Sequence, residues 1–230
     1  MKFDTYVIIG RVFPAVLSSV PFFILHYFLL GQKLGEFWNQ FLEVKIIPDI
    51  TVALVLLFLL IQFNRFVSKE VFEKIIYVNG KNFPTTDFLL HLNSYFSPEY
   101  TKQIHERIRM DFKIEIPSPR EETSAEQLSR QKISEAISHI RAKVGKGNLV
   151  GQHNSEYGFV RNLAGGSIIA GIVSLINIAV FSTFYFSKLA LVLSCATFAL
   201  YFLYLLFAKR IISNVGKDYA KVFIQEYMSL

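Results

Sequence analysis

Four apolar stretches of about membrane-spanning length constrain this chain more than any other feature. They cover residues 12–30, 50–63, 163–184 and 189–207. A helix needs about 20 mostly apolar residues to cross roughly 30 Å of hydrocarbon. The second stretch is shorter, and we expect residues 46–49 to extend it. Pro14 and Pro21 interrupt the first stretch, which predicts a bent helix there. The sequence therefore predicts an all-α membrane protein with four transmembrane helices.

The composition agrees with this class. Hydrophobic residues make up 52% of the 230 residues and charged residues only 18%, whereas about a quarter of a soluble domain is charged. Cys195 is the single cysteine, so no internal disulfide can form. These values exclude a disordered chain, a disulfide scaffold and an ordinary soluble enzyme. Because Arg11 interrupts the first apolar region and a span-length run follows it, we expect a retained span rather than a signal peptide.

The basic residues of the loops indicate the topology. Residues 64–162 contain 15 basic residues (Lys and Arg) and 12 acidic residues (Asp and Glu), whereas residues 31–48 contain two basic and two acidic residues. Cytoplasmic loops carry an excess of Lys and Arg, so both termini and residues 64–162 are expected in the cytoplasm, below a bacterial inner (plasma) membrane. Trp38 is expected at the membrane interface, unless it is simply packed. The predicted domains are a first hairpin (1–63), a helical cytoplasmic insert (64–162), a second hairpin (163–207) and a cytoplasmic tail (208–230).

The insert itself shows helical signals. We expect the second span to continue through residues 66–77, and short and long helices over 84–93 and 120–144. Ser97 followed by Pro98 predicts a helix start, since serine caps helices and proline suits the first turn. Residues 113–117 are expected to be extended, either as a short strand or as a linker. The apolar faces of these helices are expected at Tyr100, Ile104, Ile108 and Phe112 and at Ile133, Ile137, Ile140 and Val144.

A polar cluster lies immediately before the third stretch. Arg161 and His153 could hold a phosphate headgroup, a nucleotide or an acidic loop of a partner at this boundary. In the alternative, the cluster caps and anchors the span. His153 and Glu156 have a spacing that can ligate a metal on a helix, but we expect no metal site. The candidate ligand- or partner-binding residues are His153, Asn154, Glu156, Tyr157, Arg161 and Asn162.

Small residues then recur along the third stretch. Small side chains at four-residue spacing let helices approach closely in lipid. The contact could be with another subunit, could line a pore, or could be made with another span of the same chain. Two such rows favour a homo-oligomer. The candidate packing or oligomerisation residues are Gly165, Gly166, Ser167, Ala170, Gly171 and Ser174.

Inside the four stretches, His26 and Asn177 are the principal polar residues at depth. Ionisable groups within membranes often mark ion or proton pathways. A neutral histidine near the end of a span, however, is more often hydrogen-bonded or directed to the interface. The absence of acidic residues at depth and of an inverted repeat argues against a coupled transporter.

No catalytic motif occurs, so the chain is expected not to be an enzyme and to need no cofactor. A membrane hydrolase built on His153 and Glu156 is the enzymatic alternative. The net charge is +6 and the isoelectric point about 9.3. Much of that charge lies beside the spans, where it favours anionic lipid headgroups over nucleic acid.

Two functions follow as hypotheses. In the first, an oligomeric membrane effector senses a cytosolic protein or a small signalling ligand through its insert, and its spans then rearrange to leak ions. In the second, a non-conducting scaffold docks a cytosolic enzyme at the bilayer. A housekeeping channel or transporter component is a third alternative.

The layout resembles the small multi-span membrane proteins of bacterial anti-phage defence, such as the transmembrane component of Kiwa and four-span effectors of nucleotide-signalling systems. The resemblance covers span count, chain length and the basic insert. No residue maps onto a family signature, so no functional residue is carried over, and no nucleotide-binding fold stands out in the insert. The resemblance implies a protein that disturbs the membrane of an infected cell or tethers a cytosolic effector there.

Overall fold

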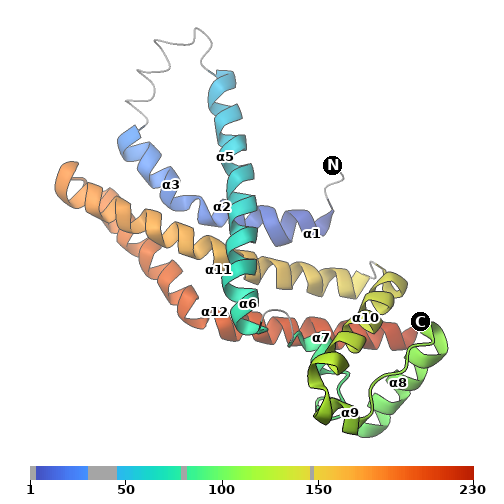
Figure 1. Ribbon diagram of the computed structural model, residues 1–230. Helices are drawn as coiled ribbons and strands as arrows, with labels where there is room; N and C mark the ends of the chain where they lie inside the picture. Colours follow the sequence, from blue (N-terminus) through green and yellow to red (C-terminus); the bar gives the residue numbers. More distant parts are fainter. Residues whose placement is uncertain (1–3, 31–45, 79–81, 146–147) are drawn as a thin grey trace. The chain divides into compact units, whose positions relative to one another are not determined.

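The computed structural model describes residues 4–30, 46–78, 82–145 and 148–230 (Figure 1). The described residues are 86% helical and contain no strand, which confirms the predicted all-α class. Trp38, predicted at the membrane interface, lies outside the described residues. Among these residues, three helices are long and apolar enough to cross a membrane: Thr5–Leu29, Leu149–Phe184 and Lys188–Ser229. The chain therefore has the helices of a membrane protein.

The contacts divide the chain into two compact units. The apolar unit comprises Met1–Phe72 and Gly158–Ile211, and the polar unit comprises Glu73–Tyr157 and Ile212–Leu230. Helices α11 (Asn148–Ala179) and α12 (Lys188–Ser229) contribute residues to both units. The domain boundaries predicted above describe the course of the chain through a membrane, and they remain predictions.

The first apolar helix of the apolar unit is broken, and its prolines explain why. A proline has no N–H for the carbonyl four residues earlier, which leaves the carbonyls of Gly10 and Leu17 without their helical donors. The Asn162 amide donates to the Gly10 carbonyl at 2.5 Å, and the Tyr201 hydroxyl donates to the Leu17 carbonyl at 2.6 Å. The predicted bend is confirmed (Figure 1). The segments are α1 (Thr5–Val7), η1 (Ile8–Val12), α2 (Phe13–Ser18), α3 (Val20–Leu25) and η2 (His26–Leu30).

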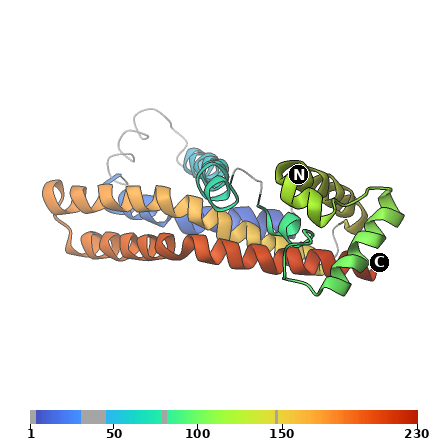
Figure 2. The same ribbon diagram turned by 60° about the horizontal axis from the view of Figure 1, so that its bottom comes forward.

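Three further helical runs contribute to the apolar unit and continue into the polar unit. The second predicted stretch forms α5 (Ile46–Val67), which continues as η3 (Ser68–Glu73) and α6 (Lys74–Ile76). The continuation of this helix beyond the stretch is as predicted. Helix α11 ends in η4 (Val180–Phe184) and lies beside α12 (Figures 1 and 2).

The α11 helix begins earlier than its apolar stretch. It starts at Asn148, whereas the predicted span starts at residue 163. Residues 153–162 are therefore helical, and they do not form a cap for the span. Between α11 and α12, the Ser174 and Thr197 hydroxyls are hydrogen-bonded at 3.1 Å. The Tyr204 hydroxyl donates to the Val160 carbonyl at 2.8 Å.

Two predicted helix lengths in the polar unit are wrong, and one buried carboxylate accounts for the first. The helix expected over 84–93 ends at Asp87, and the helix expected over 120–144 breaks at Ala125. Glu122 is 3% exposed and accepts hydrogen bonds from the backbone N–H groups of His91 and Leu92. This long-range contact draws those N–H groups away from a helical pattern. The helices are α7 (Pro84–Asp87), α8 (Pro98–Phe112), α9 (Pro119–Ser124) and α10 (Glu126–Val144).

The core of the polar unit lies between α8, α10 and the end of α12. Ser97 caps α8 by accepting from the Tyr100 N–H, as predicted. The four residues of the α10 stripe and two of the α8 stripe are buried, which confirms the predicted faces. Residues 208–230, predicted as a tail, continue α12 without a break. They contribute Ala220, Phe223, Ile224 and Tyr227 to this core.

Candidate functional site

The predicted cluster at 153–162 is divided between the two compact units. His153, Asn154, Glu156 and Tyr157 belong to the polar unit, whereas Arg161 and Asn162 belong to the apolar unit. His153 Nδ1 and Glu156 Oε2 lie 3.3 Å apart, and the Tyr157 hydroxyl donates to Glu73 at 3.0 Å. In the described part of the chain, no three His, Cys, Asp or Glu side chains gather as they would around a metal. The pairing of His153 with Glu156 is thus a contact within one helix.

Asn162 belongs to a different group, which we call the polar centre: Ser18, Asn64, Ser68 and Asn162. These four side chains are buried in the apolar unit. The Asn64 amide donates to Ser18 Oγ at 2.8 Å, and Ser68 Oγ lies 3.0 Å from Asn162 Oδ1. Three helical runs therefore meet through polar side chains. The sequence analysis found Asn162 but missed Asn64 and Ser68, which lie at the polar end of the second apolar stretch.

Two glycines of the small-residue face make room for the polar centre. A Cβ at Gly165 would collide with the backbone oxygen of Asn64 and lie 2.8 Å from the Ser68 nitrogen. A Cβ at Gly166 would lie 2.7 Å from the Asn64 amide nitrogen and 2.9 Å from Ser18 Cβ. These close contacts are made within the chain, in agreement with the alternative that the small residues pack against another helix of the same chain.

The rest of the small-residue face differs from position to position. The Ser167 hydroxyl donates to the Leu163 carbonyl at 2.8 Å, Ala170 is fully buried, and Ser174 bonds with Thr197. A Cβ at Gly171 would meet no heavy atom within 4 Å. Gly171 is thus the glycine of this face with room for a second copy of the chain, and the homo-oligomer remains a prediction.

Gly171→Leu tests that prediction. If a second copy packs at this glycine, a leucine side chain separates the helices, because close approach in lipid depends on small residues. We expect a smaller particle in detergent, measured by light scattering, with unchanged helicity. An unchanged particle mass would show that Gly171 makes no subunit contact.

The two polar residues predicted at depth differ in their surroundings. Asn177 is fully buried in the apolar unit and donates to the Pro21 carbonyl at 2.7 Å. His26 lies in η2 with an exposed side chain. Asn177 thus supports the broken first helix, as Asn162 does.

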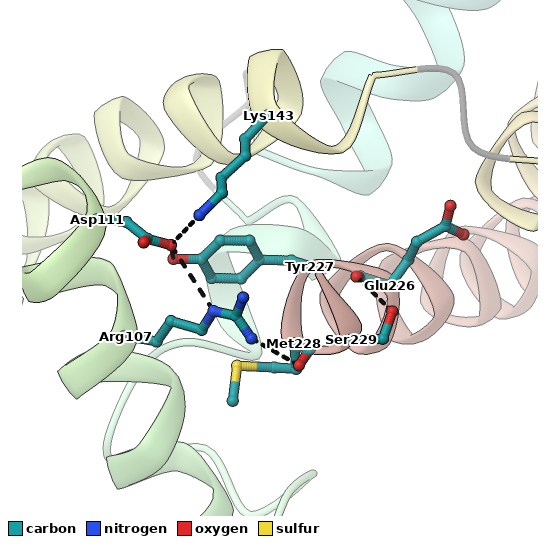
Figure 3. Close-up of polar contacts among 7 residues, drawn as sticks. All are labelled: Arg107, Asp111, Lys143, Glu226, Tyr227, Met228 and Ser229. Atoms are coloured by element: carbon teal, nitrogen blue, oxygen red, sulfur yellow. Dashed lines mark hydrogen bonds and ion pairs between the residues drawn. The ribbon is translucent and has the colours of Figure 1, made fainter.

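A second polar group lies in the polar unit, and we call it the C-terminal lock: Arg107, Asp111, Lys143 and Tyr227. Asp111 Oδ2 accepts from Lys143 Nζ at 2.6 Å and from the Tyr227 hydroxyl at 2.9 Å, and Arg107 Nε lies 3.7 Å away (Figure 3). Arg107 also donates to the Met228 carbonyl at 2.7 Å. Both cations lie against the Tyr227 ring. One carboxylate therefore joins α8, α10 and the last turn of α12.

The charges of the lock support one another. The Lys143 ammonium and the Tyr227 hydroxyl hold the pKa of Asp111 below its usual range. Burial, together with the bond to Asp111, raises the pKa of Tyr227, so its hydroxyl stays a donor. The sequence analysis missed this group because its members are far apart in the chain. The signal that could have found its last member is the apolar spacing of Ala220, Phe223, Ile224 and Tyr227.

An open cleft of about 390 Å³ also occurs in the polar unit. His105 lines it, and its Nε2 lies 2.7 Å from the Leu89 carbonyl. The His91 ring stands at 4.5 Å, nearly perpendicular to the His105 ring. Burial lowers the pKa of His105 to about 4, so its ring is neutral at pH 7. The other lining residues include both signs of charge: Lys102, Glu106, Arg109, Glu115 and Glu121.

Comparisons with protein families, curated proteins and solved structures found no relative of this chain. No protein family matches this chain, and no curated protein or solved structure is significantly similar to it.

Proposed function

We propose that the chain is a gated membrane effector of the bacterial inner membrane, with antiviral defence as its setting. Its α5 forms the fourth span beside the three long apolar helices, and the spans form two hairpins with the polar unit in the cytoplasm. A cytosolic protein or a small signalling ligand acts on the polar unit. The apolar units of a homo-oligomer then rearrange and leak ions, which arrests the cell.

The observation that carries this proposal is the double role of α12. Its first part is the fourth apolar stretch, and its last turns supply four residues to the core of the polar unit. No flexible linker separates these parts, since the helix runs from Lys188 to Ser229. A change in the core of the polar unit therefore acts directly on a helix that spans the bilayer. A scaffold that only tethers an enzyme needs no such connection.

The C-terminal lock is the natural holding point for α12 in the closed state. Charge-assisted hydrogen bonds such as those of Asp111 are about twice as strong as neutral ones. Without the carboxylate, Arg107 and Lys143 would face each other as like charges across the Tyr227 ring. Loss of the charge of Asp111 should therefore weaken the hold on the end of α12 by about 1–2 kcal/mol.

Asp111→Asn tests the gating. A loss of about 1.4 kcal/mol raises the population of the released state about tenfold. We expect purified Asp111→Asn protein to dissipate a potassium-diffusion potential faster than the wild type, in liposomes of phosphatidylethanolamine and phosphatidylglycerol. A voltage-sensitive dye reports the potential. Hydrogen exchange at residues 212–230 should rise in the same sample.

Glu226→Gln is the matched control. Glu226 precedes Tyr227 on α12, but its side chain is not part of the lock (Figure 3). This variant should hold the potential as the wild type does. Faster hydrogen exchange at residues 212–230 without a leak would refute the effector hypothesis and favour the scaffold hypothesis. Unchanged exchange would refute the lock as the holding point.

A further inference from the structure

The acceptors of the polar centre outnumber the donors that reach them. Ser68 Oγ has one hydrogen, yet three acceptors lie within hydrogen-bond distance of it: the Asn64 carbonyl at 2.7 Å, the Arg65 carbonyl at 3.1 Å and Asn162 Oδ1 at 3.0 Å. A serine hydroxyl can serve only one or two of them. Asn64 Oδ1 is buried and has no hydrogen-bond partner. Asn162 Oδ1 therefore competes with two carbonyls for the Ser68 hydrogen, and Asn64 Oδ1 has no donor.

Each amide of the centre also has a hydrogen to spare. An asparagine NH₂ carries two hydrogens. Asn64 Nδ2 donates to Ser18 Oγ, and Asn162 Nδ2 donates to the Gly10 carbonyl. The centre thus offers two acceptors, Asn64 Oδ1 and Asn162 Oδ1, and two donors. A ligand that both donates and accepts would satisfy the unpartnered Asn64 Oδ1 and use a spare amide hydrogen.

The side chain that lacks a partner is deeply buried. Asn64 is 1% exposed and Asn162 is also 1% exposed. Buried polar atoms in native proteins nearly always have a partner, often an ordered water with two to four hydrogen bonds. In the apolar unit, bulk solvent cannot supply that partner. The orphaned Oδ1 therefore points to a bound ligand.

The charge around the centre selects a neutral ligand. An arginine adjoins each of three participating residues: Arg11 follows Gly10, Arg65 follows Asn64, and Arg161 precedes Asn162. None of the hydrogen bonds described for the centre involves a carboxylate. A bound cation needs opposite charge or many oxygen ligands in a buried site. The described hydrogen bonds of the centre supply no opposite charge, which favours a neutral ligand.

We propose that the polar centre binds water between Asn64 and Asn162. The water donates to Asn64 Oδ1 and accepts from the spare hydrogen of the Asn162 amide. It joins α5 and α11 at the place where Gly165 and Gly166 bring these helices together. If the proposed effector function holds, this is the point from which the interior of the apolar unit becomes hydrated during the leak.

A crystal structure of the full chain in a lipidic mesophase, at a resolution that resolves waters, tests the site. We expect a density peak at about 2.7–3.0 Å from Asn64 Oδ1 and from the Asn162 amide. Well-ordered side chains without a peak would overturn the proposal. Thermal unfolding in sodium, potassium and choline chloride supplies the second arm. A shift specific to one cation, lost in Asn64→Leu, would identify a cation and equally overturn the assignment to water.

The hydration role has its own variant, whose outcome is distinguishable from that of the effector. In the leak assay, we expect Asn64→Leu to reduce the leak of the Asp111→Asn protein at least tenfold, because leucine offers water no partner. If the water peak is present but Asn64→Leu does not reduce the leak, the hydration role is refuted and the water site still stands. A water peak in a chain whose Asp111→Asn variant never leaks refutes the effector and leaves the site. A leak from the Asp111→Asn variant without a water peak refutes the water site and leaves the effector function.

Discussion

Gly165→Ala should lower the thermal unfolding midpoint of the detergent-solubilised chain by about 6–12 °C. The added Cβ would collide with the backbone oxygen of Asn64 and crowd the backbone nitrogen of Ser68. Overpacking typically costs about 1–3 kcal/mol, and backbone obstacles cannot change rotamer, so the cost should be at the upper end. For a chain of this size, each kcal/mol shifts the midpoint by about 2–4 °C.

The same helix supplies a graded series of controls. At Gly166 the obstacles are the Asn64 and Ser18 side chains, which can move, so Gly166→Ala should cost less. At Gly171 no heavy atom lies within 4 Å of the new Cβ, so Gly171→Ala should not lower the midpoint, and the better helix propensity of alanine, about 0.5–1 kcal/mol, should raise it by about 1–4 °C. Equal losses in all three variants would show that helix flexibility, rather than the approach of α5 and α2, determines the effect.

The parts of the fold that the sequence predicted are those encoded in local spacing. The apolar stripe at Ile133, Ile137, Ile140 and Val144 and the cap at Ser97 needed only helical periodicity and a serine before a proline. The bend in the first helix followed from two prolines. Each of these signals lies within a few turns of helix, where propensity and burial act together.

The parts that the sequence did not reveal depend on contacts between distant residues. Glu122 sets the end of α7 from more than 30 residues away, and the lock joins residues 107, 111, 143 and 227. Of the candidate site residues, Asn162, Gly165 and Gly166 meet at the polar centre, whereas the contacts described for His153 and Glu156 lie within α11. The partners of the first three, Asn64 and Ser68, carry no motif, since a polar residue at the end of an apolar stretch normally marks a boundary.

The polar centre and the broken first helix follow from one physical requirement. In an apolar environment every carbonyl freed by a proline must find a donor. Asn162 and Tyr201 supply those donors to Gly10 and Leu17, and Asn177 donates to the Pro21 carbonyl nearby. The asparagines of α11 therefore stabilise the broken first helix. The remaining hydrogen-bonding groups of Asn162 and Asn64 are available to a ligand.

Acidification from pH 7 to pH 5 should destabilise the polar unit by about 2 kcal/mol through His105. Burial is the main cause of its lowered pKa, about 4 against an ordinary value of 6.5, and the neighbouring His91 adds to it. Below about pH 6.5 the unfolded chain binds a proton that the folded chain does not, so the free energy of unfolding falls with pH until about pH 4. Asp111 contributes nothing in this window, because its pKa lies below its ordinary value of 3.8.

Hydrogen exchange of the α8 and α10 amides in the full chain measures this effect. After correction for intrinsic exchange rates, protection should fall about 20–30-fold from pH 7 to pH 5, since about 1.4 kcal/mol is a factor of ten. His105→Gln should abolish most of that fall, because a glutamine amide can donate to the Leu89 carbonyl without titrating. His139→Gln is the matched control, since His139 is an exposed histidine of α10 beside Phe112, and it should keep the wild-type acid response. An unchanged response in His105→Gln would refute His105 as the group that takes up the proton.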